Sequence, residues 1–107
     1  MASAVESLGA EEIGAELGRR ATLVQISSAF CQPCRATRRI LTDVASMVEG
    51  VANVEVDAES HLELVRRLEV RGTPTVFVLD ACGRIVRRAQ GQPRKADVIA
   101  ALGRVVA

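Results

Sequence analysis

Apolar residues along this chain occur in short runs typical of strands and at spacings typical of helices. Residues 21–27 (ATLVQIS) are largely apolar and partly β-branched, which predicts a central, buried strand. Residues 51–57 predict a second strand and residues 75–79 a third. Residues 84–88 alternate between polar and apolar positions, as expected for an edge strand. The pattern therefore predicts four strands.

Helical spacings fall between these strands. In residues 10–20, Ile13 and Leu17 lie four positions apart, with acidic residues early and arginines late, which predicts a helix. Residues 32–49 carry the longest apolar stripe at helical spacing, and Gly50 is expected to end that helix. A helix thus precedes the first strand and another follows it.

Two further helices are predicted later in the chain. Ser60 and Glu63 have the spacing of a capping box ahead of an apolar run. Pro93 is expected at the first helical position of the last helix. A fifth, short strand is allowed for near residues 4–8.

The resulting order, α-β-α-β-α-β-β-α, predicts one α/β domain spanning residues 1–107. Strand–helix–strand units call for parallel pairing, and the final hairpin adds an antiparallel edge. Helices should cover both faces of a central mixed sheet of four or five strands, giving a three-layer α/β/α sandwich.

The composition of the chain argues against several classes of function. The 107 residues suffice for one core, and the net charge of +1 argues against a dedicated nucleic-acid or membrane-surface binder. Aromatic residues make up only 2% of the chain, so stacking on nucleic-acid bases is disfavoured. No apolar run is long enough for a transmembrane helix, and the first residues do not resemble a secretory signal. We therefore expect a cytoplasmic protein.

Three cysteines are too few for a secreted disulfide framework, which leaves redox chemistry or metal binding for the close pair Cys31 and Cys34. Two residues separate them, so at the start of a helix both sulfur atoms can reach disulfide geometry. Cys31 would lie where free backbone N–H groups favour a thiolate, and is the expected nucleophile. Cys34, one turn inside the helix, would resolve the mixed disulfide.

Other interpretations of the pair remain open. A buried pair of small apolar side chains is one, and a zinc site is another. Zinc would need two more ligands, for which His61 and Cys82 are the remaining histidine and cysteine, both distant in sequence. A site shared across a dimer would be a variant of this interpretation. Cys82 should lie in the turn formed by residues 80–83.

Residues 30–35 (FCQPCR) resemble the thioredoxin active-site motif Trp-Cys-Gly-Pro-Cys-Lys. Residues 70–75 (VRGTPT) are similar to the cis-proline loop of that family, and residues 54–57 to the strand after its active-site helix. Residues 81–84 match a later hairpin turn, and Gly91 matches a glycine near the active site. The resemblance spans about residues 22–106.

This resemblance implies a thioredoxin fold in which Pro74 is cis and packs against the dithiol. Thr73 would present its backbone to a substrate peptide. The resemblance places further residues in the substrate-binding surface: Phe30, Gln32, Pro33 and Gly91.

The chain departs from the family pattern near the dithiol. Phe30 replaces the usual Trp, and Gln32 the usual Gly, which leaves the redox potential open. Gln25 aligns with the buried Asp that thioredoxins use to move a proton at the resolving cysteine, and Asn53 with the Lys that often partners it. Because Gln cannot titrate, we expect Cys34 to lose its proton to water or to the leaving thiolate.

We therefore predict a thiol–disulfide oxidoreductase that reduces or exchanges protein disulfides without a cofactor or metal. Expected partners are disulfide-containing proteins and a thioredoxin reductase as electron donor, and the protein is expected to be a monomer. The alternative is a thioredoxin-fold adaptor or redox sensor with little turnover.

Overall fold

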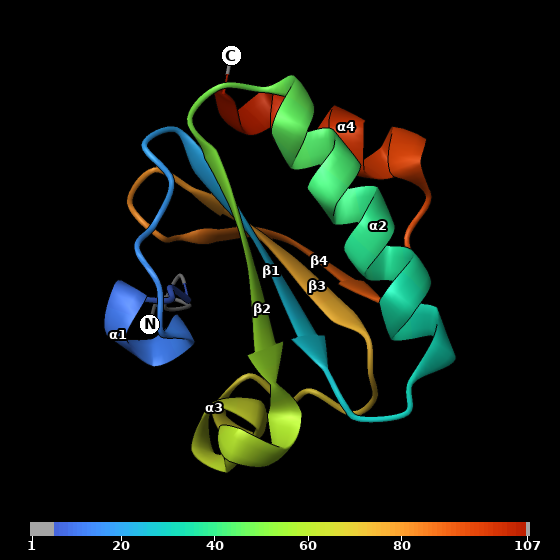
Figure 1. Cartoon of the computed structure of the whole chain (residues 1–107). Coiled ribbons are helices and arrows are strands. Elements are labelled where there is room, and N and C mark those ends of the chain that lie inside the picture. The colour runs from blue at the N-terminus through green and yellow to red at the C-terminus, as the bar shows by residue number, and fades with distance from the viewer. Residues whose placement is uncertain (1–5, 107) are drawn as a thin grey trace.

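A mixed four-stranded sheet forms the centre of the computed structural model, which describes residues 6–106. Its spatial order is β2-β1-β3-β4 (Figure 1). The strands are β1 (Ala21–Ser27), β2 (Val51–Asp57), β3 (Thr75–Asp80) and β4 (Ile85–Gln90). The helices are α1 (Ala10–Ile13), α2 (Gln32–Met47), the 3-10 helix η1 (Ala58–Ser60), α3 (Leu62–Arg67) and α4 (Lys95–Val106).

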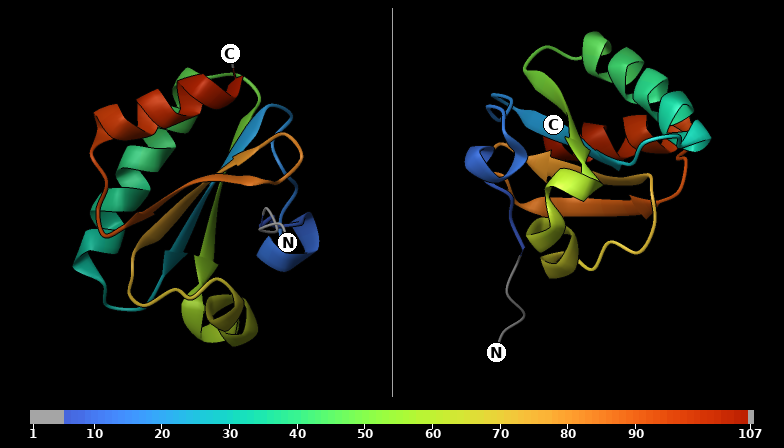
Figure 2. Two further views of the ribbon diagram at one scale, coloured as in Figure 1. Left: turned by 180° about the vertical axis from the view of Figure 1, so that it is seen from behind. Right: turned by 60° about the horizontal axis from the view of Figure 1, so that its bottom comes forward.

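Helices cover both faces of the sheet, which confirms the predicted three-layer sandwich. Helices α2 and α4 lie side by side on one face, and α1 and α3 lie on the other (Figures 1 and 2). Strand β1 is buried along its whole length, and its side chains alternate between two cores. Val24 and Ile26 join Phe77 on the α1 and α3 side, whereas Leu23 joins Leu41 of α2 on the other side.

The first helix is shorter than predicted. The expected helix over residues 10–20 ends at Ile13, because Gly14 takes a left-handed conformation with φ of +74°. The chain then runs in irregular conformation to β1 and passes close to the backbone at Gly18, where a Cβ atom would lie 2.1 Å from the carbonyl oxygen of Ala21. Two glycines therefore end the helix and allow this close approach.

The direction of β3 differs from the prediction. Strands β1 and β2 are parallel, as the first strand–helix–strand unit predicts, but β3 is antiparallel to β1. Helix α3 has only six residues, about 9 Å of rise, whereas the seven residues of β2 span about 23 Å. Helix α3 is therefore too short to return the chain to the other end of the sheet. Strand β3 starts at the end of the sheet where β2 finishes and runs antiparallel to β1.

Several element boundaries also differ from the predictions. The capping box is wrong: His61, not Ser60, precedes α3, and the Ser60 hydroxyl donates to Asp57 Oδ2 at 2.9 Å. Helix α4 begins at Lys95 rather than Pro93. Of the strand near residues 4–8, one bridge between Ser7 and Arg84 is seen, and residues 4 and 5 lie outside the described part. No helix within residues 6–106 combines the length and apolarity needed to cross a membrane.

Candidate active site

The cysteine pair lies at the junction between the end of β1 and the start of α2. Strand β1 ends at Ser27, and the chain turns at Phe30, whose φ of +61° lies in the left-handed region. Cys31 is the N-cap of α2, and Cys34 lies in its first turn. The two are joined as a disulfide with an S–S distance of 2.17 Å and a Cα–Cα distance of 5.2 Å. Pro33 falls in this first turn, where a missing backbone N–H costs nothing.

The two sulfur atoms have different surroundings. Cys31 is partly exposed, whereas Cys34 is only 1% exposed. The Cys34 backbone N–H donates to Cys31 Sγ at 3.2 Å, so a thiolate on Cys31 would have a hydrogen-bond donor in place. A substrate can therefore reach Cys31 from solvent, whereas Cys34 is shielded from it.

Two other segments meet the dithiol turn. The Thr73–Pro74 peptide bond is cis, as the resemblance implies, and Pro74 is buried. The hydroxyl groups of Ser28 and Thr73 share a hydrogen bond of 2.7 Å, and the Gly91 N–H donates to the Pro74 carbonyl oxygen at 2.8 Å. Residues far apart in sequence are therefore held together around Cys31.

The side chains expected to line a substrate-binding surface are accessible to different degrees. Phe30 is fully exposed, and Gln32 and Pro33 are also exposed. Thr73 and Gly91 are partly exposed. A fully exposed aromatic ring next to a reactive cysteine is an apolar contact available to a partner.

Gln25 lies directly behind the dithiol. Its side chain is 1% exposed, and Nε2 donates to the carbonyl oxygen of Cys34 at 2.8 Å and to Ser27 Oγ at 2.9 Å. A buried amide group thus holds the backbone of the second cysteine. An ionised carboxylate at this position could not make these contacts, because it has no proton to donate.

Asn53 is not a partner of Gln25. Its side chain is exposed and donates to Thr42 Oγ1 of α2 at 3.2 Å. In the parallel ladder Asn53 pairs with Leu23, and the residue opposite Gln25 is Glu55. The two departures from the family pattern therefore have separate surroundings.

Glu55 was not anticipated as part of this region. Arg38 of α2 donates to both of its carboxylate oxygens, each at 2.8 Å. This hydrogen bonding from Arg38 holds the pKa of Glu55 below its usual range, a hydrogen bond from Ser27 acts in the same direction, and partial burial opposes both. The only available signal was the period-two spacing of Asn53 and Glu55, which puts both on the α2 face of β2.

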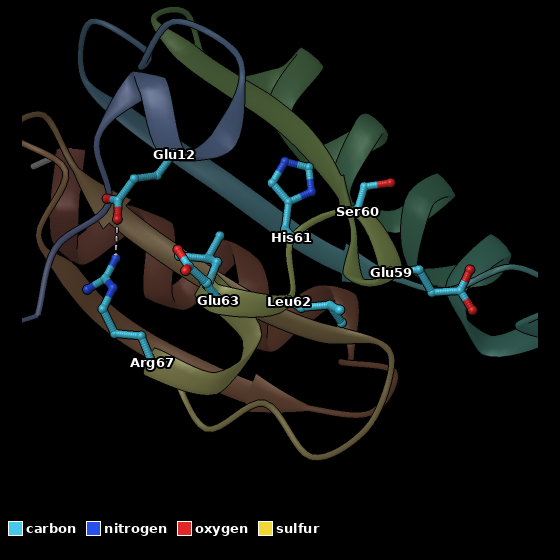
Figure 3. Close-up of a pocket in the computed structure, with 8 residues that line it drawn as sticks. Glu12, Glu59, Ser60, His61, Leu62, Glu63 and Arg67 are labelled. Atoms are coloured by element: carbon cyan, nitrogen blue, oxygen red, sulfur yellow. Dashed lines mark hydrogen bonds and ion pairs between the residues drawn. The ribbon is translucent and has the colours of Figure 1, made fainter.

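The other chemically interesting residues lie away from the dithiol. Cys82 is exposed in the turn between β3 and β4, and the pairing of Ala21 with Asp80 puts that turn at the opposite end of the sheet. His61 lines a hollow of about 560 Å³ beside α3, where Glu12 of α1 pairs with Arg67 (Figure 3). Within residues 6–106, no three histidine, cysteine or acidic side chains gather as candidate metal ligands.

Solved structures resemble this fold closely. A mutant thioredoxin from Halobacterium salinarum matches with a TM-score of 0.75 and 18% identity, covering 83% of this chain and 77% of that one. A chloroplastic thioredoxin z matches with a TM-score of 0.71 and 22% identity over 98% and 96%. A thioredoxin from Fasciola hepatica matches with a TM-score of 0.70 and 22% identity over 82% and 83%. At these identities the likeness shows the fold.

Sequence comparison adds the family. No curated protein matches the chain, but the family model described as a thioredoxin-like domain matches residues 10–105. That range contains the Cys31–Cys34 disulfide, a redox-active centre in this fold. The chain therefore belongs to the family of thioredoxin-like domains.

Proposed function

We propose that this protein reduces disulfides in other proteins by a dithiol–disulfide exchange at Cys31 and Cys34. The observation that carries the proposal is the asymmetry of the pair: Cys31 is reachable and accepts a hydrogen bond from the Cys34 N–H, while Cys34 is buried behind it. This arrangement suits one attacking and one resolving sulfur.

The reaction has two exchange steps. The Cys31 thiolate attacks one sulfur of the substrate disulfide, the substrate S–S bond breaks, and the departing thiolate takes up a proton. Cys34 then loses its thiol proton and attacks the sulfur of Cys31, which closes the Cys31–Cys34 disulfide and expels the second substrate thiolate. Two electrons pass to the substrate, which leaves as a dithiol.

The surface around Cys31 would hold the substrate chain. Thr73, next to the cis peptide bond, would pair through its backbone with an extended segment beside the substrate disulfide. The exposed ring of Phe30 would add an apolar contact, with Gln32, Pro33 and Gly91 completing the surface.

We also propose where this protein acts and what reduces it. The protein would act as a monomer in the cytoplasm, without a cofactor, on disulfide-containing proteins. A thioredoxin reductase would return the Cys31–Cys34 disulfide to the dithiol. A reduction potential near about −270 mV would support this reducing role, whereas one above about −200 mV would indicate disulfide exchange or oxidation.

Insulin reduction followed by turbidity, with dithiothreitol as the electron source, tests the proposal. We expect the wild-type protein to accelerate precipitation, Cys31→Ser to abolish the acceleration, and Cys82→Ser to leave it unchanged. Cys82→Ser is the matched control because it removes an exposed thiol at the other end of the sheet. A wild-type rate no higher than that of Cys31→Ser would refute the reductase proposal and favour the adaptor or redox-sensor alternative.

A further inference from the structure

The segments that build the candidate site share one sign of charge. Residues 28–35, 70–75 and 90–94 contain three arginines, Arg35, Arg71 and Arg94, and no aspartate or glutamate. The chain as a whole has a net charge of +1, so the residues outside these segments carry a net charge of −2. Positive charge is therefore concentrated around the dithiol.

The three segments that carry these arginines meet around the dithiol. The hydrogen bond between Ser28 and Thr73 joins the first segment to the second, and the hydrogen bond from Gly91 to Pro74 joins the second to the third. All three arginine side chains are exposed. We call Arg35, Arg71 and Arg94 the basic rim.

The basic rim is available to a partner. The ion pairs seen within residues 6–106 are Arg38–Glu55, Arg67–Glu12 and Lys95–Asp43, and none of them involves a rim arginine. The rim guanidinium groups also make no hydrogen bond to another described residue. Their charge is thus not neutralised by the protein itself.

Acidic side chains at the end of β2 line a hollow beside the dithiol turn. Glu55 is held by Arg38, and the Asp57 carboxylate accepts hydrogen bonds from the Glu59 N–H and the Ser60 hydroxyl. Asp57 and Glu59 are both exposed in the hollow that also contains Ser28, and hydrogen bonds from neutral groups do not cancel the charge of Asp57. These two carboxylates stand against three rim arginines, so we expect a positive electrostatic potential at Cys31.

We propose that the basic rim selects protein disulfides whose half-cystines are flanked by acidic residues. This inference rests on the proposed reductase function and names its substrate class. Arginine suits the task because its planar guanidinium group can bind a carboxylate through two hydrogen bonds. One exposed ion pair changes an equilibrium constant by at most about fivefold, so discrimination needs several arginines acting together with long-range attraction.

Competing disulfide peptides test the selection. Three peptides share one disulfide and differ only in the four residues around it, which are glutamate, glutamine or lysine. At low salt we expect the glutamate peptide to be reduced with a kcat/KM about tenfold above that of the lysine peptide. The ratio should fall in about 0.5 M salt, where the screening length is only a few ångströms.

Charge-reversal variants show whether the rim arginines cause this preference for acidic peptides. We expect the double variant Arg71→Glu, Arg94→Glu to invert the order of the glutamate and lysine peptides. The double variant Arg84→Glu, Arg87→Glu makes the same change in net charge on β4 and its preceding turn, away from the dithiol, and should retain the wild-type order. Equal rates for the three peptides with the wild-type protein, or inversion by both double variants, would overturn the proposal.

A binding measurement separates this proposal from the reductase function. Fluorescently labelled versions of the peptides with serine in place of both cysteines can bind but cannot react, and fluorescence anisotropy gives their dissociation constants. Tighter binding of the glutamate peptide by the wild-type protein would support selection by the basic rim. If the disulfide peptides were not reduced in the same experiments, the reductase function would be refuted, but the selection by charge would stand. Equally tight binding of a labelled single-stranded oligonucleotide of the same charge would overturn the assignment to acidic peptides.

Discussion

Replacing Gln25 by aspartate tests how the buried amide controls the resolving cysteine. Gln25 lies behind Cys34 and donates to its carbonyl oxygen, and it has no group that can take a proton. A carboxylate at this place could accept the proton that Cys34 must lose before it attacks Cys31. We therefore expect Gln25→Asp to speed the release of a mixed disulfide at pH 7.

Gln25→Asp should also lower the free energy of unfolding, by an amount that can be estimated from the hydrogen bonds of Gln25. Gln25 Nε2 donates two hydrogen bonds at a position that is 1% exposed, and an ionised carboxylate can donate neither. If the Ser27 hydroxyl turned to donate to that carboxylate, it would give up its hydrogen bond to Glu55. Each lost bond costs about 0.5–1.5 kcal/mol, and the missing methylene group about 1 kcal/mol more, so we expect a loss of about 2–4 kcal/mol. Burial raises the pKa of the introduced carboxyl group above its unfolded value. The variant should therefore be most stable below that unfolded value, about 4, and lose stability as the pH rises through the folded pKa.

A chromophoric mixed disulfide at Cys31 gives the rate directly. In a Cys82→Ser background, the reduced protein reacts with an aromatic disulfide, and stopped-flow absorbance follows expulsion of the second aromatic thiolate by Cys34. General-base catalysis is commonly worth a factor of about 10² or more, so a rise of at least about tenfold at pH 7 is expected. Gln25→Asn is the matched control, since it has the same length as aspartate but cannot titrate. A folded Gln25→Asp variant that releases the thiolate no faster than Gln25→Asn would refute the reasoning.

Two further predictions concern stability, measured by urea unfolding. Gly18→Ala should destabilise the protein by about 3 kcal/mol or more, because the added Cβ would collide with the Ala21 carbonyl oxygen. Gly103→Ala should instead stabilise it by about 0.5–1 kcal/mol, because Gly103 lies in a helix with open space around it. Equal effects of these two substitutions would contradict the packing described at Gly18. Because Arg38 lowers the pKa of Glu55, that ion pair should stabilise the fold above the unfolded pKa of about 4.3 and cease to do so as the pH falls through the folded pKa. Urea midpoints of wild type and Glu55→Gln should therefore differ at pH 7 and converge at pH 3, and a constant difference would count against the assignment.

Strong apolar patterns predicted the strands best. The bounds of β1 and β2 match the prediction because both runs are β-branched and supply residues to the two cores. The direction of β3 alone was predicted wrongly, since it depends on how far α3 can carry the chain, and the apolar run did not reveal that this helix has only six residues. The first helix was overextended because Gly14 adopts its left-handed conformation within an otherwise helical pattern.

Local sequence motifs predicted one part of the candidate site and missed another. The spacing of Cys31 and Cys34 between a strand and a helix placed the two cysteines, whereas the cis conformation at Pro74 was expected only from the resemblance to the thioredoxin family. The contact of Gln25 with Cys34 uses a backbone carbonyl, which no side-chain pattern reveals. Glu55 comes to face Gln25 only through the register of β1 with β2, a relation between segments thirty residues apart.

The surroundings of Gln25 and Asn53 change how their joint departure from the family pattern is understood. A joint loss of charge would be required if both positions were buried, because neither charge could remain without its partner. Asn53 is exposed, however, so a charge there could be solvated and places no constraint on position 25. The buried amide must be explained by its own contacts, which hold the Cys34 carbonyl and the Ser27 hydroxyl. Gln25 thus holds the backbone of Cys34, and under the proposed mechanism a group other than Gln25 would remove the proton of this cysteine.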